Sequence, residues 1–368
     1  MRLHAVSDHD TEATADVVVI GGGQAGLAAG YYLRRSGLSF VILDAEPAAG
    51  GAWQHAWDSL TLFSPARYSS LPGRMMPGDD ATMPSRDDVV AYLDAYERRY
   101  ELPVERNVRV DRVQDADDGL LVLAGARRWH ASAVISATGS WSAPHIPQLP
   151  GADRFAGLQL HSARYRTPAP FAGKRVAVVG GGNSGAQILA ELSRHTETVW
   201  MTERPPRFMA DDVDGRVLFD AATAARNALR QGDRDAARGV GGLGDIVMLP
   251  SVKDARQRGV LVATSAPVAL DRDGARRADG SREPLDAIVW CTGFRPATRH
   301  LADLEVLDAG GRTPVEGTRC VEEPRLWMLG YGDWTGFASA TLIGVGRSAR
   351  ATVAEIVASL SQERRIAR

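Results

Sequence analysis

Residues 16–44 read DVVVIGGGQAGLAAGYYLRRSGLSFVILD, and the order of features in this stretch decides the fold. A short β-branched run ends at Ile20 and leads directly into a glycine-rich turn, after which apolar residues recur with the spacing of a helix. A second apolar run, residues 39–43, ends at Asp44, 18 residues after the last glycine of the turn. A strand, a glycine turn, a helix, a strand and an acidic residue in this order are typical of a dinucleotide-binding site.

Each glycine of this first turn has its own physical task. Gly21 permits the tight turn, Gly23 lets the backbone approach a pyrophosphate, and Gly26 lets the helix pack closely on the strand. The start of the helix adds unpaired N–H groups and the positive end of a dipole, both of which favour phosphate. A tight turn in some other α/β fold is the alternative, and the full context disfavours it. The residues predicted to hold this dinucleotide are Gly21, Gly23, Gln24, Ala25, Gly26 and, through a ribose hydroxyl, Asp44.

The same order returns in residues 174–203, KRVAVVGGGNSGAQILAELSRHTETVWMTE. Glu203 again lies 18 residues after the last glycine of its turn, and two turns with the same spacing are hard to obtain by chance. The sequence therefore predicts an α/β protein with two Rossmann-like dinucleotide-binding domains. One dinucleotide should be a flavin and the other a nicotinamide, because hydride transfer between them is the natural use of such a pair. The second site is predicted to consist of Gly180, Gly182, Asn183, Ser184, Gly185, Glu203 and Arg204.

The residues after the second turn leave the choice between NADPH and NADH open. Glu203 can accept a hydrogen bond from a ribose 2′-hydroxyl and would repel a 2′-phosphate, which favours NADH. Arg204 and Arg207 could pair with that phosphate, which favours NADPH, although isolated charges usually lie in water. We expect either cofactor to work.

The bulk composition bounds the other possibilities. A chain of 368 residues with 44% hydrophobic residues has the size of about two domains and can bury a real core. Its formal charge of −2 gives no field that would gather nucleic acid or an anionic membrane. The two cysteines, Cys291 and Cys320, form no C-x-x-C motif and no metal-ligand spacing, which nearly excludes a dithiol redox centre. The polar N-terminus and the lack of a long apolar run predict a soluble, cytoplasmic protein.

Local patterns predict the elements between the two turns. Residues 85–100 should form a helix with a start resembling a capping box, and residues 106–135 should form three short strands. A polar helix at 213–230 and the loop at 239–245 look like an insertion that covers the nicotinamide side.

A proline-rich connection at residues 142–151 marks a domain boundary. Residues 1–150 and 296–368 should therefore form a discontinuous FAD-binding domain. The NAD(P)H-binding domain, residues 151–295, would be inserted between these two segments.

Three further candidates lie outside the glycine turns. Gly51 and Trp53 belong to an irregular segment rich in glycine and aromatic residues, which suits a surface near a ligand, whereas Trp57 is expected only to seal the core. Asp333 follows an apolar strand and could accept hydrogen bonds from a polyol or cap a helix. Cys291 is expected to be a small core residue.

Two predicted strands end in Thr-Gly, at Thr138-Gly139 and Thr292-Gly293. The chain resembles the flavin-containing monooxygenases, which are class B flavoproteins, in these endings, in the turns GGGQAG and GGGNSG, and in the GGAW segment. The stretch FAGLQLHSARY also fits that family's fingerprint F-x-G-x-x-x-H-x-x-x-Y through Phe155, Gly157, His161 and Tyr165. The chain looks closest to a short bacterial branch that accepts NADH as well as NADPH, and this branch is close to monooxygenase-like proteins associated with arsenic operons. We expect His161 to be structural rather than a proton donor.

The resemblance implies a role for each site. It places FAD on the first turn with Asp44 at its ribose, Gly51 and Trp53 along the cofactor, and Asp333 at the ribityl chain. It places NADPH or NADH on the second turn, where Glu203 and Arg204 match the positions that read the 2′-phosphate in typical members.

The reaction implied by the resemblance begins with reduction of FAD by NAD(P)H. O2 then forms a C4a-(hydro)peroxyflavin, which oxygenates a soft nucleophile such as a sulfide, or a ketone by Baeyer–Villiger oxidation. The expected partners are a small-molecule substrate and O2, with no nucleic acid, membrane or metal, and a homodimer is left open.

Phe63 departs from the family pattern. Many members carry an asparagine at this position beside the reactive flavin carbon, and an aromatic ring cannot donate a hydrogen bond there. Slow turnover and release of hydrogen peroxide are therefore expected. An NAD(P)H oxidase and a redox-sensing nucleotide-binding protein remain as alternatives, whereas the missing cysteine pair disfavours a disulfide reductase.

Overall fold

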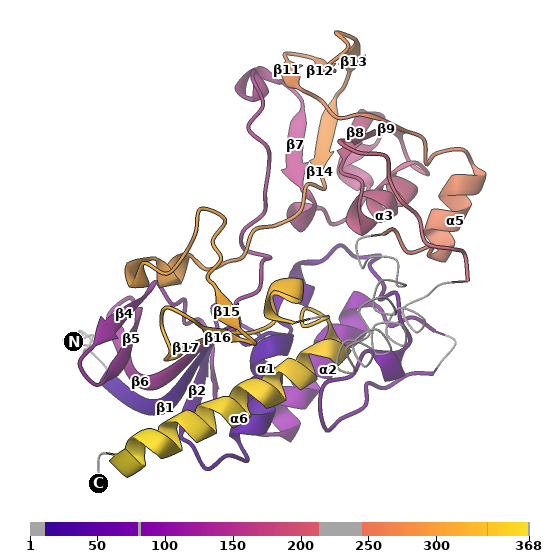
Figure 1. The fold of residues 1–368 in the computed structure, drawn as a ribbon. Coiled ribbons are helices and arrows are strands. Elements are labelled where there is room, and N and C mark those ends of the chain that lie inside the picture. The colour runs from indigo at the N-terminus through magenta and orange to yellow at the C-terminus, as the bar shows by residue number, and fades with distance from the viewer. Residues whose placement is uncertain (1–11, 80–81, 213–244, 337, 367–368) are drawn as a thin grey trace, which may run out of the picture.

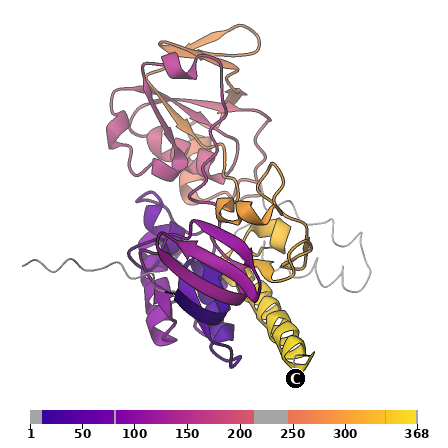
Figure 2. The same cartoon turned by 90° about the vertical axis from the view of Figure 1, so that its left-hand side faces the viewer.

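The computed structural model describes residues 12–79, 82–212, 245–336 and 338–366, and its chain forms two sheet-based units, one above the other (Figures 1 and 2). The helix predicted at 213–230 and nearly all of the loop predicted at 239–245 lie outside these residues. Within the described part of the chain, no helix is long and apolar enough to cross a membrane.

The first unit, here called the nine-stranded unit, combines both ends of the chain. Its sheet has the order β15-β16-β17-β6-β1-β2-β3, and β5 pairs with both β6 and β4. The strands β17, β6, β1, β2 and β3 run parallel to one another. The pairs β15–β16, β16–β17, β4–β5 and β5–β6 are antiparallel. The strands are β1 (Glu12–Ile20), β2 (Phe40–Leu43), β3 (Val104–Glu105), β4 (Arg112–Ala116), β5 (Gly119–Ala124), β6 (Arg127–Ser136), β15 (Val315–Glu316), β16 (Arg319–Cys320) and β17 (Leu326–Met328).

Alternate residues of these strands fill two hydrophobic cores. Val17 and Val19 face the helices α1 (Gln24–Leu33), α2 (Arg86–Arg99) and α6 (Leu342–Ile366), while Val18 and Ile20 face the β4–β5 hairpin and the segment near Leu301. Figure 1 shows the three helices side by side on one face of the sheet. The sheet is therefore covered on both faces, as parallel strands require.

Two local predictions can be compared directly with the nine-stranded unit. α2 begins after Ser85, and the reciprocal capping box between Ser85 and Asp88 is present, so this helix start is confirmed. β1 is longer than the predicted run from Asp16, because residues from Glu12 onward pair with β6. Strand pairing, rather than apolar content, extends β1 towards the N-terminus.

The second unit, here called the five-stranded unit, has an all-parallel sheet in the order β10-β9-β8-β14-β7. Its strands are β7 (Leu158–His161), β8 (Arg175–Val179), β9 (Glu197–Thr202), β10 (Ala263–Ser265) and β14 (Ala287–Trp290), and its helices are α3 (Asn183–Leu192) and α5 (Pro250–Gln257). A small antiparallel sheet of β11 (Ala269–Asp271), β12 (Gly274–Arg276) and β13 (Arg282–Pro284) precedes β14. This small sheet lies at the amino ends of the parallel strands, at the top of Figure 1.

Two linkers connect the units, and backbone hydrogen bonds pair them with each other. His145 N–H donates to Gly293 at 2.9 Å, and Ala297 N–H donates to Gly139 at 2.8 Å. Three side chains from the nine-stranded unit also pack in the hydrophobic core of the five-stranded unit, namely Trp57, Leu60 and Phe63. Trp57 is buried, as expected for a residue that seals a core, but that core belongs to the other unit.

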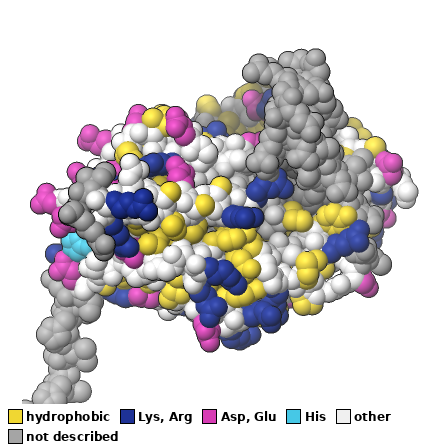
Figure 3. Space-filling model, turned by 60° about the horizontal axis from the view of Figure 1, so that its bottom comes forward, with side chains coloured by type: hydrophobic (Ala, Val, Ile, Leu, Met, Phe, Trp, Pro, Cys, Tyr) yellow, Lys and Arg dark blue, Asp and Glu magenta, His cyan; other side chains and the backbone are white. Residues whose placement is uncertain are grey.

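One face of the molecule has a distinctive charge pattern. In Figure 3, Lys and Arg side chains gather among hydrophobic ones, and acidic side chains lie mostly nearer the edge. This concentration of positive charge is local, because the formal net charge of the chain is −2.

Candidate functional site

The first glycine turn lies at the carboxyl end of β1, and steric contacts explain its glycines. Gly21 has φ +106°, and an added Cβ would lie 2.6 Å from the carbonyl oxygen of Ala137. A Cβ at Gly26 would collide with the carbonyl oxygen of Gly21, so α1 packs on the turn without any side chain between them. α1 begins at Gln24 with no side-chain cap, which leaves its first N–H groups free to bind an anion.

The predicted residues Gln24, Gly51 and Trp53 meet at this turn. Gly51 has φ +51°, and its added Cβ would lie only 2.8 Å from the Cα of Gly23. The indole N–H of Trp53 donates to Gln24 Oε1 at 3.1 Å, and Gln24 Nε2 donates to the carbonyl of Ala340 at 2.6 Å. The Gln24 side chain therefore joins the irregular segment and the approach to α6 at the mouth of the turn.

Asp44 directly follows β2, lies beside Gly22 of the same turn and is only 5% exposed. Its carboxylate forms an ion pair with Arg106, which also pairs with Glu97 of α2. Burial raises the pKa of Asp44, and Arg106 acts against that rise. The sequence analysis missed Arg106 and Glu97, because neither residue belongs to the glycine-turn motif.

Asp333 lies exposed in a short 3-10 helix, Gly332–Thr335, close after β17. The alternative role of a helix cap is not seen, since this short helix has no side-chain cap and α6 begins only at Leu342. The neighbouring turn approaches the first site closely, because a Cβ at Gly330 would lie 2.6 Å from the Cβ of Ala25. Asp333 therefore follows a turn that packs against the first residues of α1.

A buried hydrogen-bond network stands behind this turn. The Tyr331 hydroxyl lies 2.7 Å from both Ser136 Oγ and Thr138 Oγ1, and Ser136 Oγ lies 3.1 Å from His300 Nε2. Thr138 also donates to the carbonyl of Ala297 at 2.8 Å. Burial raises the pKa of Tyr331 and lowers that of His300 to about 4, so both side chains are neutral at pH 7. The network joins the chain ends after β6 and β17 to the returning linker, the segment after β14 that leads back to the nine-stranded unit.

The second glycine turn repeats the first one at the carboxyl end of β8. Gly180 has φ +137°, and its Cβ would collide with the carbonyl oxygen of Cys291, just as Gly21 meets Ala137. A Cβ at Gly185 would collide with the carbonyl oxygen of Gly180. The lack of a side chain on the first glycine of each turn therefore lets the backbone of Ala137 or Cys291 lie against that turn.

The Asn183 side chain at the second turn contacts a later segment of the chain. The Asn183 amide is engaged within the protein, since it donates to Asp245 O at 3.2 Å and accepts from Val247 N at 2.9 Å. One N–H and one acceptor position of the amide remain, together with the backbone N–H of Asn183 at the start of α3, a helix that also includes Ser184. Cys291 is partly buried against the core of the five-stranded unit, and burial raises the pKa of its thiol to about 12.

Glu203 and Arg204 are both exposed directly after β9, beside the second turn. A Cβ at Gly181 would lie 3.7 Å from the carbonyl oxygen of Arg204, so this segment borders the turn itself. Arg207 is exposed as well, and it pairs with Asp245 at 2.7 Å. The charged groups of the second site therefore lie in solvent.

The fingerprint stretch forms the edge strand β7 and the turn after it. His161 is buried, and its Nδ1 accepts the N–H of Ala163 at 3.1 Å, so the proton is on Nε2, which donates to Gly293 at 2.9 Å. The ring of Phe294 meets the imidazole edge-on at 4.9 Å, and burial lowers the pKa of His161. These contacts fasten the returning linker to β7, which supports a structural role.

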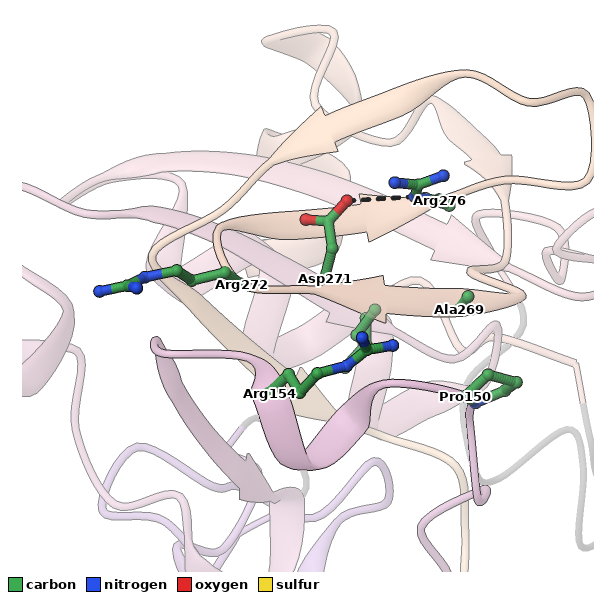
Figure 4. Close-up of a pocket in the computed structure, with 7 residues that line it drawn as sticks. Pro150, Arg154, Ala269, Asp271, Arg272 and Arg276 are labelled. Atoms are coloured by element: carbon green, nitrogen blue, oxygen red, sulfur yellow. Dashed lines mark hydrogen bonds and ion pairs between the residues drawn. The ribbon is translucent and has the colours of Figure 1, made fainter.

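Phe63 lies half-buried between the units and packs against the core of the five-stranded unit. A separate hollow of about 410 Å³ is lined by Arg154, Leu270 and Asp271, among others (Figure 4). It lies beside the small sheet at the amino ends of the parallel strands, whereas dinucleotides bind at the carboxyl ends. We therefore assign no cofactor to this hollow.

Two glycine turns, each at the carboxyl end of a parallel strand in its own sheet, define a two-dinucleotide-binding oxidoreductase fold. Known proteins match this arrangement. The family model described as pyridine nucleotide-disulphide oxidoreductase matches residues 18–232, more than half of the chain. The structure of the flavin-containing monooxygenase from Stenotrophomonas maltophilia is 54% identical in sequence with a TM-score of 0.86, covering 95% of this chain and 99% of that one.

Two curated relatives extend the comparison. The uncharacterized oxidoreductase CzcO of Bacillus velezensis is 31% identical, covering 93% of this chain and 99% of its own. The indole-3-pyruvate monooxygenase YUCCA1 of Oryza sativa subsp. japonica is 29% identical, covering 90% of this chain and 89% of its own.

The chain therefore belongs to the flavin-containing monooxygenases within the pyridine nucleotide-disulphide oxidoreductase family. This confirms the predicted family, the two-dinucleotide α/β fold and the expectation of an oxidoreductase enzyme. Membership in this family implies FAD together with a nicotinamide cofactor.

Proposed function

We propose that the protein is an FAD-dependent monooxygenase that consumes NADPH or NADH and O2 and oxygenates soft nucleophiles such as sulfides, or ketones by Baeyer–Villiger oxidation. The observation that carries this proposal is the pair of uncapped helix starts behind two glycine turns, with the segment from Trp57 to Phe63 lying between the units. Residues 1–150 and 296–368 would hold FAD, and residues 151–295 would hold NAD(P)H.

The residues at the first turn fit FAD. Gly23 and Gly51 approach each other so closely that a Cβ on Gly51 would lie 2.8 Å from the Cα of Gly23. Neither residue has a side chain that would keep a pyrophosphate away from the backbone of the turn. Asp44 offers an acceptor to the adenosine ribose, and Asp333 is the candidate acceptor for the ribityl hydroxyls. The Gln24–Trp53 hydrogen bond holds the covering segment in place over the turn.

The second turn fits a dinucleotide that enters and leaves. Among the residues that the structure describes, none would meet a Cβ at Gly182 within 4 Å, and none caps the start of α3 with its side chain. Glu203 and Arg204 stand exposed beside this turn, where they can act on the 2′ position of the nucleotide.

When bound, FAD supplies the hard chemistry, because it accepts the hydride of NAD(P)H and activates O2. This chain's own residues bind the two nucleotides, orient them and exclude water between the units. His161 takes no part in proton transfer in this scheme, because both of its ring nitrogens are engaged with backbone groups.

Phe63 favours a second candidate function, an NAD(P)H oxidase that releases hydrogen peroxide. A phenyl ring has no hydrogen-bond donor, and one preorganised donor in a dry site is worth about 3 kcal/mol of charge stabilisation. Replacing Phe63 by Asn should restore a donor. We expect this variant to form more oxygenated product and less peroxide per NADPH consumed than the wild type.

The decisive experiment measures aerobic NADPH and NADH consumption with hydrogen peroxide recorded in parallel. The panel contains sulfides, ketones, organoarsenicals and an aromatic 2-oxo acid, the last because one relative is named for indole-3-pyruvate. Oxygenated product in proportion to NAD(P)H supports the monooxygenase, whereas nearly complete peroxide release with every compound supports the oxidase. Failure of NAD(P)H to bleach the flavin absorbance without oxygen would instead indicate a redox-sensing binding protein.

A further inference from the structure

Arg106 lies beside Asp44 because of the register between two parallel strands. β2 and β3 pair Ile42 with Val104 and Leu43 with Glu105, and the N–H of Asp44 donates to the carbonyl of Glu105 at 2.9 Å. The next residue of each strand then faces the other at the carboxyl edge of the sheet. The fold therefore delivers a guanidinium to the acid at the end of β2.

The Arg106 guanidinium spans two carboxylates in a largely buried position. One nitrogen binds Asp44 and another binds Glu97, which comes from the last turns of α2. The exposed fraction of the side chain is 17% for Arg106, 8% for Asp44 and 19% for Glu97. In such a place the interaction of charges is much less screened than on the surface.

We propose that Arg106 is a positioning residue that holds the Asp44 carboxylate as an anionic acceptor, turned towards the adenosine ribose of FAD. This inference rests on the proposed function, because it takes the first turn to be the FAD site. Arg106 binds Asp44 from the side of β3, while the turn glycines lie on the other side.

The carboxylate retains capacity for a ribose hydroxyl. Two carboxylate oxygens offer about four acceptor positions. Arg106 takes one, and the N–H of Glu46 makes only a long contact of 3.4 Å. A hydroxyl of the ribose can therefore occupy a remaining position or replace the long contact.

Removing the guanidinium would change the charge state of this cluster. Burial raises the pKa of both Asp44 and Glu97, and Arg106 lowers both values. Nearby negative charges raise the two pKa values further, Glu46 for Asp44 and Asp44 for Glu97. Without Arg106, two half-desolvated acids would share a site with no counter-charge. Asp44 would then take up a proton at a higher pH and would lose part of its capacity as an acceptor.

The test is FAD binding to the apoprotein as a function of pH, followed by quenching of flavin fluorescence. We expect the wild type to bind FAD with nearly constant affinity between pH 6 and pH 9. Arg106→Gln should bind about ten- to hundredfold more weakly at pH 6, the range expected for a hydrogen bond to a charged group, and should recover towards pH 9. A uniform loss at every pH, or no loss at all, would overturn the inference.

Two further variants keep the result interpretable. Arg106→Lys retains the charge and should keep the affinity independent of pH, so a pH-dependent loss in this variant would also overturn the inference. Asp44→Asn should weaken binding equally at every pH, because the replaced group does not titrate. A pH-dependent loss in Asp44→Asn would show that another group is responsible.

Arg127→Gln is the matched control. It removes a neighbouring ion pair, between Arg127 and Glu105 of β3, without touching Asp44, and should leave the pH profile of FAD binding unchanged. The same changed profile in Arg127→Gln as in Arg106→Gln would count against a specific role of Arg106. If the wild-type apoprotein itself fails to bind FAD, the proposed function fails, whereas normal wild-type binding with an unaltered Arg106→Gln variant defeats only this inference.

Discussion

Two acidic residues occupy equivalent places in the two glycine-turn motifs and have opposite surroundings. Asp44 is 5% exposed and carries an arginine partner, Arg106, delivered by the adjacent strand. Glu203 is exposed, and among the described residues it has no ion-pair partner. The same motif has therefore produced a buried acid paired with an arginine in one unit and an exposed acid in the other.

This difference teaches how one motif can serve a resident cofactor and an exchanging one. A buried acceptor that is ionised and oriented before binding costs little further ordering, which favours tight binding. An exposed acid must give up its hydration, and its interactions are weakened by water and salt. If the first turn holds FAD and the second holds NAD(P)H, as proposed, the first site is suited to retain its cofactor and the second to release it.

The largest expected effect comes from adding one methyl group where the helix packs on its glycine turn. Gly26→Ala and Gly185→Ala each place a Cβ against the carbonyl oxygen of the first glycine in their own turn. Because backbone must shift, we expect each variant to lose about 3 kcal/mol or more of binding free energy for its own nucleotide. Gly26→Ala should purify without FAD, as measured by flavin absorbance.

Gly185→Ala should instead retain FAD and need more than about a hundredfold higher NADPH concentration for anaerobic flavin reduction. Each variant is the control for the other, since both add one methyl group at the same motif position. Loss of FAD from both variants would show that the two sites do not bind independently.

A second, somewhat smaller effect is expected at the junction between the two units. His161→Ala leaves the carbonyl of Gly293 and the N–H of Ala163 without their imidazole partner. The free energy of unfolding should fall by about 2–3 kcal/mol, measured by urea denaturation. The pH profile of flavin reduction should not move; a shifted kinetic pKa with intact stability would show that His161 acts in catalysis.

His300 predicts the pH dependence of stability in the first unit. Burial lowers its pKa to about 4, below the unfolded value of about 6.5, so the unfolded chain takes up the proton first. The stabilisation is present in full above pH 6.5 and is lost as the pH falls towards 4, at up to about 1.4 kcal/mol per pH unit. The stability of the wild type and of His300→Gln should therefore converge over this range; a constant difference would contradict the prediction.

The parts of the site that could be predicted from sequence are those set by local sterics. Gly21, Gly26, Gly180 and Gly185 meet backbone atoms of their own strand–turn–helix unit or of the strand beside it, so their spacing alone reveals them. Asp44 and Glu203 follow from the same spacing. The capping box of α2 is equally local, because both of its partners lie within four consecutive residues.

The missed parts depend on contacts between distant segments. Arg106 meets Asp44 only through the β2–β3 register, and Tyr331 meets Ser136 only because β17 adds to β6 from the far end of the chain. The hydrogen bonds of the Asn183 amide to Asp245 and Val247 were missed for the same reason, because these partners come from a later segment of the chain. No local pattern carries information of this kind.

The smallest expected effect concerns the open second site and tests whether exposure makes its charges weak selectors. Arg204→Gln should raise the KM for NADPH about fivefold and leave that for NADH nearly unchanged, because an exposed arginine can contribute only a modest attraction to a 2′-phosphate. Glu203→Gln should lower the KM for NADPH by a similar factor, since it removes a like charge. Steady-state NADPH and NADH oxidation measures both values.

Arg207→Gln is the comparison variant for Arg204, because its guanidinium is held by Asp245 at 2.7 Å and its charge is partly neutralised. We expect a smaller change in the KM for NADPH from Arg207→Gln than from Arg204→Gln. Raising the ionic strength should reduce the difference between wild type and Arg204→Gln, as it does for exposed charges in general. A change of a hundredfold or more in either variant would mean that the second site closes around its nucleotide and becomes as buried as the first, which would remove the contrast between the two turns.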